Sequence, residues 1–279
     1  MNITPLNKLI FIPFLLLNSL NVLSQKNKQS KDYALFFAVN EYDNLRNLNN
    51  PISNARGIAN ILKKDYGFET EIVENPSLTM ITDKLREYYT QFQNGEKDRN
   101  GQLLLFFSGH GMVEFENGYF LAKDTDPKSL FNSGINYEIW RPFIDQIRCK
   151  HILVAIDACY SVRFDRNWKN RANPFFQRPG ELNETERMLS DHEKNKARFL
   201  FTSDGNEEET PDKSGFAKKF QEALISGGGF DGILTSTEVF TYLERARPKP
   251  HGNQFGDDEP GSSFLFVKRQ ENPVNTFRS

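Results

Sequence analysis

The chain has 279 residues, with 35 Lys and Arg against 37 Asp and Glu, so its formal net charge is −2. This balance argues against a nucleic-acid-binding surface or a polybasic membrane anchor, because either needs a local positive excess. Hydrophobic residues make up 38% of the chain, which is enough for a core and excludes a wholly disordered protein. Two cysteines, Cys149 and Cys159, are too few for a disulfide framework in a chain of this size.

Residues 1–24 have the pattern of a secretory signal peptide. Lys8 precedes an apolar run from Leu9 to Leu17, and Ser24 is a small residue before the expected cut. The run is shorter than the roughly 20 residues that a membrane-spanning helix needs. We therefore expect an exported protein, periplasmic or extracellular, in which residues 25–32 form a polar lead-in. A retained membrane anchor is the alternative.

The remainder of the chain alternates short apolar runs with residues at helical spacing. Strands are expected at 33–39, 70–74, 103–107, 151–156, 199–202 and 263–267. Apolar stripes predict helices between them, at 55–62 with Gly67 as its end, 81–92, 139–147 and 216–224. Thr235 and Glu238 match a capping box that opens a last helix, and Asn117-Gly118 matches a hairpin turn. This alternation predicts an α/β fold, with a mostly parallel sheet covered by helices on both faces.

Two of the expected strands run directly into residues that carry chemistry. Residues 103–107 lead into a segment with His110 between two glycines, and residues 151–156 lead into Asp157-Ala158-Cys159. Ligands of parallel sheets bind at the carboxyl ends of strands, and the ends of neighbouring strands lie about 5–10 Å apart. Cys159 and His110 are therefore candidates for a nucleophile and base. A lone Cys is more often a buried small hydrophobe and a lone His a turn residue, but their joint placement at strand ends favours catalysis.

The motifs FFSGHG at 106–111 and IDACYS at 156–161 resemble those of the metacaspases and bacterial caspase-like proteins. Their spacing fits the caspase pattern of a His about 50 residues before the Cys, and the resemblance extends over most of residues 33–268. It implies a caspase-like three-layer sandwich with a six-stranded, mostly parallel central sheet. One peptidase domain would cover 33–270, with a long loop at 163–197 between its halves and a tail at 271–279.

The resemblance also implies a role for each matching residue. Cys159 would attack a peptide carbonyl and His110 would act as general acid and base. The backbone N–H groups of Gly111 and Cys159 would hold the oxyanion. Asp157 would favour an Arg or Lys side chain just before the scissile bond, although it is also placed as a helix N-cap would be. No cofactor would take part in the bond cleavage.

Three positions depart from the family pattern. Asn54 stands where the family commonly has Asp, so half of the expected pocket charge is missing. Tyr160 replaces a frequent His after the Cys, and Val162 replaces the usual Gly. A β-branched residue does not readily adopt a positive φ, so the last departure bears on the geometry of the loop.

The apolar periodicity fails over 163–197, which predicts a long functional or disordered loop. Its arginines fit the self-cleavage that the resemblance implies, and a solvated surface loop is the alternative. The resemblance leaves calcium activation open, since some metacaspases need Ca²⁺. No acidic cluster has the spacing of an EF-hand; the clusters are Asp124 with Asp126, 204–209 and 257–259.

We expect a peptide or protein substrate, no nucleic acid, and no membrane span after signal removal. The sequence leaves the oligomeric state open. Two other functions also remain open: a catalytically silent caspase-fold module that binds peptides or proteins, and a His–Cys hydrolase that acts on other amides.

Overall fold

The computed structural model describes residues 30–167, 190–203, 215–228 and 232–269. Contacts divide the chain into two units, Met1–Ser30 and Lys31–Ser279, and the following description concerns the second. The predicted signal peptide and the tail at 271–279 lie outside the described residues, as does the larger part of the predicted loop. Among the described residues, no helix combines the length and the apolarity that crossing a membrane requires.

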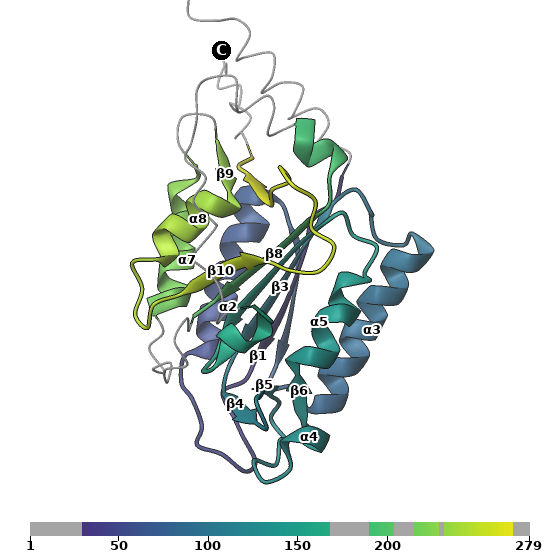
Figure 1. Cartoon of the computed structure of the whole chain (residues 1–279). Coiled ribbons are helices and arrows are strands. Elements are labelled where there is room, and N and C mark those ends of the chain that lie inside the picture. The colour runs from purple at the N-terminus through teal and green to yellow at the C-terminus, as the bar shows by residue number, and fades with distance from the viewer. Residues whose placement is uncertain (1–29, 168–189, 204–214, 229–231, 270–279) are drawn as a thin grey trace, which may run out of the picture. The chain divides into compact units, whose positions relative to one another are not determined.

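The centre of the second unit is a six-stranded sheet with the strand order β10-β8-β7-β3-β1-β2 (Figure 1). Neighbouring strands are parallel except that β10 runs antiparallel to β8. Every residue of β1, β3, β7 and β8 is buried, as expected for strands that are covered on both faces. The predicted α/β class with a mostly parallel sheet is confirmed. The strands are β1 (Tyr33–Ala38), β2 (Glu69–Glu74), β3 (Gln102–Ser108), β7 (His151–Asp157), β8 (Ala197–Thr202) and β10 (His251–Gln254).

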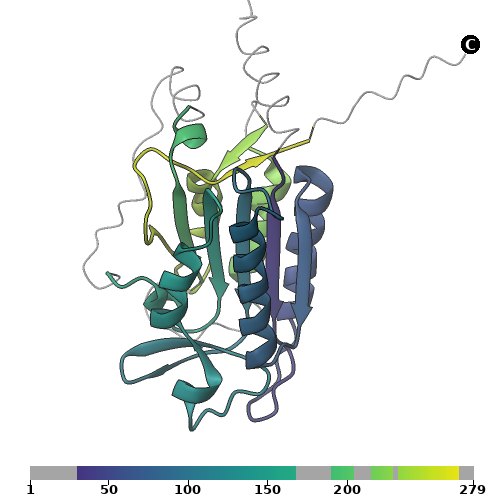
Figure 2. The same ribbon diagram turned by 90° about the vertical axis from the view of Figure 1, so that its right-hand side faces the viewer.

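Helices cover both faces of the sheet (Figures 1 and 2). The helices α2 (Pro51–Ile61), α7 (Gly215–Ser226) and α8 (Ser236–Leu243) lie on one face, and α3 (Leu78–Asn94) and α5 (Tyr137–Asp145) lie on the other. Because successive side chains of a strand point to opposite faces, Phe36 joins the core under α2 and α7 whereas Phe37 joins the core under α3. The sheet therefore separates two apolar layers.

A second, three-stranded sheet lies on the α3 and α5 side. It consists of β4 (Gly111–Glu114), β5 (Asn117–Leu121) and β6 (Gly134–Asn136), and the short helix α4 (Leu130–Ser133) leads into β6. The turn between β4 and β5 lies at Phe115 and Glu116, which have φ values of 48° and 68°. The prediction of a turn at Asn117-Gly118 was therefore wrong by two residues. Gly118 lies in β5, where a Cβ would come within 2.7 Å of the Tyr137 ring, so close packing requires this glycine.

The strand expected at 263–267 does not belong to the central sheet. Only its last three residues form a strand, β11 (Leu265–Val267), which pairs with β9 (Ile233–Thr235) in a separate ribbon. The sixth central strand is β10, whose sequence His-Gly-Asn-Gln lacks an apolar pattern and was not predicted. The capping box is confirmed, since the Thr235 and Glu238 side chains each accept a hydrogen bond from the other residue's backbone N–H.

The helix predicted for 139–147 is confirmed as α5, but its apolar stripe is only partly buried. Ile139 is 59% exposed, and α5 ends before Ile147. The buried residues of α5 are Tyr137, Arg141 and Ile144. Arg141 can be buried because its guanidinium donates to the Phe164 carbonyl and pairs with Glu138 at 2.6 Å. A charged residue with a carbonyl and a carboxylate as partners therefore occupies a buried position that an apolar pattern assigns to solvent.

The predicted loop at 163–197 begins later than the periodicity indicated. Phe164 is 2% exposed, and its ring packs edge-on against Tyr137 and Phe255. Asp165 is also buried. Residues 168–189 lie outside the described residues, so the sites expected for self-cleavage there stay a prediction.

Candidate active site

The carboxyl ends of β3 and β7 lie side by side, as predicted. Ser108 and Asp157 are register partners at the ends of these two strands, and the N–H of Gly109 donates to the Asp157 carbonyl at 3.2 Å. The residues that follow each strand therefore leave the sheet at the same edge. This edge, with the residues that follow β1, β3, β7 and β8, is called the carboxyl edge below.

Gly111 and Cys159 approach each other backbone to backbone. A Cβ on Gly111 would lie 2.0 Å from the Cys159 carbonyl oxygen and 3.3 Å from its nitrogen. No side chain other than hydrogen fits there. Cys159 is partly exposed. The segment that begins with His110 and the segment that contains Cys159 are thus in direct contact.

The ring of His110 is oriented by the loop between β1 and α2. Its Nε2 lies 2.8 Å from the Arg46 carbonyl oxygen. A carbonyl only accepts hydrogen bonds, so Nε2 carries the proton and Nδ1 is the acceptor of the neutral ring. Residue spacing carries no signal for this contact, because any residue type supplies a backbone carbonyl.

Tyr42, from the same loop, fixes the backbone of His110. Its hydroxyl oxygen accepts a hydrogen bond from the His110 N–H at 2.7 Å, and the two rings are 4.7 Å apart at their centroids. Burial raises the pKa of the Tyr42 phenol well above its ordinary value, so this hydroxyl stays protonated at neutral pH. Tyr42 was not predicted as a site residue, because no sequence pattern links it to His110 across 68 residues.

The segment after Cys159 does not place Val162 at a positive φ, the conformation that a β-branched residue disfavours. The left-handed residue is Tyr160, with a φ of 55°, and a short 3-10 helix, η2 (Ser161–Phe164), follows it. Val162 lies in this helix and is fully buried. A left-handed conformation costs an L-residue such as Tyr160 about 1–2 kcal/mol, and the packing of Val162 and Phe164 into the core offsets it.

Asp165 ties the end of this segment to strand β10. Its carboxylate accepts hydrogen bonds from His251, at 3.0 Å, and from the Asn253 amide. Burial would raise the pKa of Asp165, but the bonds from His251, from the Asn167 N–H and from Asn253 outweigh burial and lower it. A charged Asp165 therefore anchors the chain six residues after Cys159, a role that the sequence analysis missed.

Asp157 and Asn54 reach the carboxyl edge from different elements. Asp157 is the last residue of β7 and is 4% exposed. Asn54 is half-buried in the first turn of α2, and that turn is held near the end of β1 because Asn40 Oδ1 accepts the Ile52 N–H. Among the described residues, no hydrogen bond of Asn54 reaches Asp157. The two predicted pocket residues therefore reach the same edge from β7 and from α2.

The acidic clusters that left calcium open have protein partners where they are described. Asp124 accepts the N–H of Leu78 at 2.8 Å, and Asp257 pairs with Lys196 at 2.7 Å. Residues 204–209 lie outside the described residues. Within the described part of the chain, no group of three or more His, Cys, Asp or Glu is arranged to hold a metal ion.

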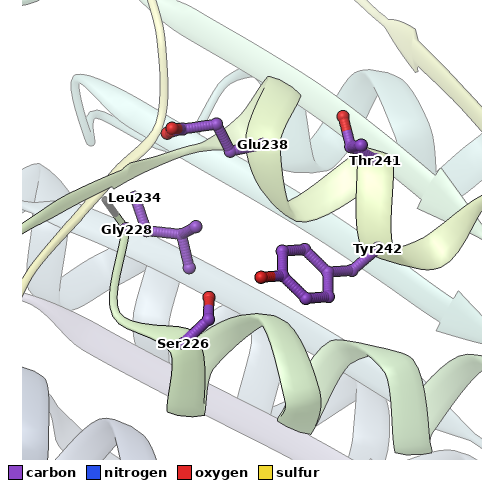
Figure 3. A pocket seen from close by; sticks show the side chains of 6 residues that line it. All are labelled: Ser226, Gly228, Leu234, Glu238, Thr241 and Tyr242. Atoms are coloured by element: carbon purple, nitrogen blue, oxygen red, sulfur yellow. The ribbon is translucent and has the colours of Figure 1, made fainter. Parts of the chain in front are cut away.

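A pocket of about 290 Å³ lies elsewhere, between the end of α7, β9 and α8 (Figure 3). The ribbon of β9 and β11 is joined to the start of β3, because Gln102 bonds to both backbone groups of Leu265. This pocket is therefore close to the opposite, amino edge of the sheet and contains none of the predicted site residues. Its lining residues are Ser226, Gly228, Leu234, Glu238, Thr241 and Tyr242.

Comparison with known proteins agrees with this arrangement. The family model described as "Caspase domain" matches residues 31–243. A search of the curated proteins finds no match. Among solved structures, caspase-1 from Spodoptera frugiperda matches with a TM-score of 0.55 and 16% identity, over 88% of this chain and 92% of that chain. A structure titled pro-sf-caspase-1 matches with a TM-score of 0.52 and 13% identity, over 86% and 90% of the two chains. This chain has the fold of a cysteine peptidase, and it belongs to the caspase domain family.

Proposed function

We propose that this protein is an exported cysteine endopeptidase that uses Cys159 and His110 and cleaves after Arg or Lys. The observation that carries the proposal is the backbone contact between Gly111 and Cys159. It joins the two segments whose motifs suggested a catalytic dyad, at the carboxyl edge of a caspase-family sheet.

The residues at this edge can carry out each step of peptide hydrolysis. His110 Nδ1 takes the proton of the Cys159 thiol, and the resulting thiolate attacks the peptide carbonyl carbon. The developing oxyanion accepts hydrogen bonds from the N–H groups of Gly111 and Cys159. His110 then gives its Nδ1 proton to the departing amine, which leaves a thioester on Cys159. In the second half of the reaction, Nδ1 removes a proton from water, the hydroxide attacks the thioester carbonyl, and the departing thiolate takes this proton back as the acid product leaves.

The His110 ring is held for this proton transfer. The Arg46 carbonyl accepts the Nε2 proton and stabilises the positive charge that forms when Nδ1 is also protonated. This backbone carbonyl has the orienting role that a carboxylate side chain has in Ser-His-Asp triads. Tyr42 holds the adjacent backbone, so the ring needs little reorganisation during the reaction.

A preference for Arg or Lys rests on Asp157. Its carboxylate is buried at the edge beside Cys159, where a basic side chain would be held with little competition from water. A planar guanidinium can pair with a carboxylate through two hydrogen bonds, so Arg should be preferred to Lys. Asn54 adds a neutral amide at the same edge.

Peptide amides that end in Arg, Lys or Asp test this proposal with the purified chain that starts at Gln25. We expect turnover of the Arg amide first and the Lys amide second, and none with Cys159→Ala. Selective cleavage of the Asp amide would reject the role of Asp157. Absence of turnover with all three amides, with and without Ca²⁺, would instead favour a peptide-binding module.

Asn54→Asp sharpens the pocket assignment. A second carboxylate near Asp157 should lower KM for the Arg amide about threefold to tenfold, because an added charge pair at a partly buried site contributes roughly 1 kcal/mol. Asn60→Asp, at an exposed position of the same helix, is the matched control. Equal effects of the two variants would mean that Asn54 is outside the pocket.

Export and self-cleavage have their own measurements. The mass of the protein recovered from outside the cytoplasm should correspond to a start at Gln25. Incubation of the purified chain should yield fragments that end at an arginine within 163–197, and Cys159→Ala should yield none. An intact mass in both cases would reject self-cleavage and leave the endopeptidase proposal standing.

A further inference from the structure

Strand β4 begins at the proposed oxyanion donor and has an open edge. It pairs with β5 on one side, and no strand among the described residues pairs with its other side. Gly111 faces Phe120, and the Leu121 N–H donates to the His110 carbonyl at 3.0 Å. In such an antiparallel ladder, Gly111 and Val113 are the residues whose N–H and C=O point away from β5. A row of backbone groups thus continues from the reaction centre along β4.

The tip of this hairpin carries an unfavourable residue. Phe115 is 89% exposed and has a φ of 48°. With Glu116 it forms a two-residue turn in which both residues have positive φ, a type that strongly prefers Asn and Gly. An exposed aromatic residue in this conformation costs stability and gains no packing. Strained residues of this kind cluster at functional sites, so Phe115 is a candidate for recognition.

A second exposed phenyl group lies close to the tip. Phe131, in α4, is 70% exposed, and its N–H donates to Glu114 at 3.1 Å. Glu114 adds a carboxylate beside the tip, whereas the exposed Glu116 is paired with Arg163 at 3.1 Å. The end of the small sheet therefore offers apolar surface to a ligand and disfavours an acidic side chain, because a carboxylate would lose water there without gaining a partner.

The position of the hairpin defines which part of a substrate can reach it. Tyr119 and Phe120 of β5 pack in the same apolar layer as α3, whereas Ala55 and Ile58 of α2 pack on the opposite face. A peptide with its basic side chain toward Asn54, on the α2 side, would cross the carboxyl edge over Cys159. Its following residues would then run toward β4, whose place Figure 1 shows.

We propose that the open edge of β4 binds the substrate residues that follow the scissile bond. This inference rests on the proposed endopeptidase function and adds a specificity site to it. The substrate extends β4 as an added strand and bonds to the N–H and C=O of Val113. Phe115 is four positions after Gly111, which is about 13 Å along a strand. An apolar side chain three or four residues after the scissile bond therefore contacts Phe115 and Phe131, and an acidic one is disfavoured.

Two substrates with the same residues before the scissile bond isolate this contact. The short one ends in Arg-aminocoumarin, and the long one is a quenched peptide with four further residues, the last of them Leu. Phe115→Asn should lower the ratio of kcat/KM for the long substrate to that for the short one about tenfold, because one apolar contact is lost. Ile225→Ser, at a 61% exposed apolar residue of α7, should leave this ratio unchanged. An unchanged ratio with Phe115→Asn would overturn the proposal.

Unfolding of Phe115→Asn would not explain a lower ratio, because Asn suits the turn better than Phe. The melting temperature of this variant should therefore be equal to or higher than that of the wild type. Phe131→Ser provides a second variant and should lower the ratio about threefold. Replacing the last Leu of the long peptide by Glu should also lower its kcat/KM.

If the wild type cleaves neither substrate, the endopeptidase proposal fails and the binding site is tested by itself. Fluorescence polarisation then measures the affinity of a labelled long peptide for Cys159→Ala, with and without Phe115→Asn. Weaker binding by the double variant supports the site on β4, and equal affinity overturns it.

Discussion

Strand β7 has a cysteine near each end, and the two differ in burial and in chemistry. Cys149 precedes the strand at the amino edge, is 2% exposed, and its thiol donates to the Gly101 and His151 carbonyls. Burial raises its pKa to about 12, so it is not a thiolate at neutral pH. Cys159 follows the strand at the carboxyl edge, is partly exposed, and lies against Gly111.

The difference between these cysteines extends to their surroundings. The amino edge is closed by side chains that bond to backbone groups, such as Gln102 to Leu265 and His192 to Ser263. The carboxyl edge is built from loops that hold one another by backbone contacts, with glycine at the closest approach. One edge thus buries its reactive groups, while the other leaves a thiol within reach of a substrate.

The largest expected effect separates the two thiols directly. Cys159→Ala should lower kcat/KM for the Arg amide by about 10⁴-fold or more, since it removes the proposed nucleophile. Cys149→Ala should keep kcat/KM within about threefold and lower the free energy of unfolding by roughly 1–2 kcal/mol, as for a small buried side chain. Iodoacetamide followed by mass spectrometry should modify Cys159 in the folded protein and Cys149 only after unfolding. Modification of Cys149 in the native state would contradict the difference in burial.

The contact between Gly111 and Cys159 gives the next largest effect. Gly111→Ala would place a methyl group 2.0 Å from the Cys159 carbonyl oxygen, so the two backbones must separate. Displacing one of the two proposed oxyanion donors should lower kcat by about 10²–10³-fold. Gly215→Ala is the matched control, because its Cβ would have ordinary contacts of 3.4 Å. Activity of Gly111→Ala equal to that of the control would show that this contact does not position the donor.

Tyr42→Phe tests whether the loop between β1 and α2 orients His110. The variant removes the oxygen that accepts the His110 N–H and leaves that donor without this bond, at a cost of about 1–3 kcal/mol. We expect kcat to fall about tenfold with KM within about twofold, because substrate contacts are kept. Tyr89→Phe, at a half-buried tyrosine of α3, is the comparison. A change in KM alone would argue that Tyr42 contacts the substrate instead.

The sequence predicted those parts of the site that side-chain patterns encode. Buried strands without polar residues identified β3 and β7, and glycines around His110 and the polar residues after β7 identified the edge. The bonds that orient the ring were not predictable, because the Arg46 carbonyl is a backbone group and Tyr42 is distant in sequence. Contacts formed by backbone atoms leave no residue-type signature.

The fold follows the same division. Strands β1, β3, β7 and β8 are apolar and were predicted, whereas β10 is polar and follows from pairing with β8. Phe115 is the opposite case, since its side chain disfavours the turn that it occupies. The Asn-Gly pair that would suit this turn is two residues further on, where Gly118 is required by Tyr137. Prediction from local residue preference therefore failed at this hairpin, because the packing of Gly118 against Tyr137 determines where the turn lies.

The smallest expected effect concerns the amino edge and its response to acid. The rings of His151 and His192 are stacked, with centroids 3.8 Å apart, and His151 Nε2 lies 2.8 Å from the His192 carbonyl oxygen. Burial and the neighbouring His192 lower the pKa of His151 to about 2, and burial lowers that of His192 to about 4. Both imidazoles thus stay neutral in the folded protein at pH 5. The unfolded chain binds a proton at each imidazole below about pH 6.5. This pair therefore makes the free energy of unfolding decrease as the pH falls from about 6.5 toward the lowered pKa values of the folded state.

Replacing one ring should weaken this response. In His192→Phe, the difference in unfolding free energy from the wild type should shift in favour of the variant by about 1–2 kcal/mol between pH 7.5 and pH 5. The measurement is a difference because Asp32, whose pKa is raised to about 7 by burial, contributes with the opposite sign in both proteins. Lys194→Ala, at an exposed residue of the same segment, should show no such shift in urea unfolding. A constant difference between His192→Phe and the wild type would mean that the amino edge opens to water when its histidines are protonated, and the contrast with the carboxyl edge would then hold only near neutral pH.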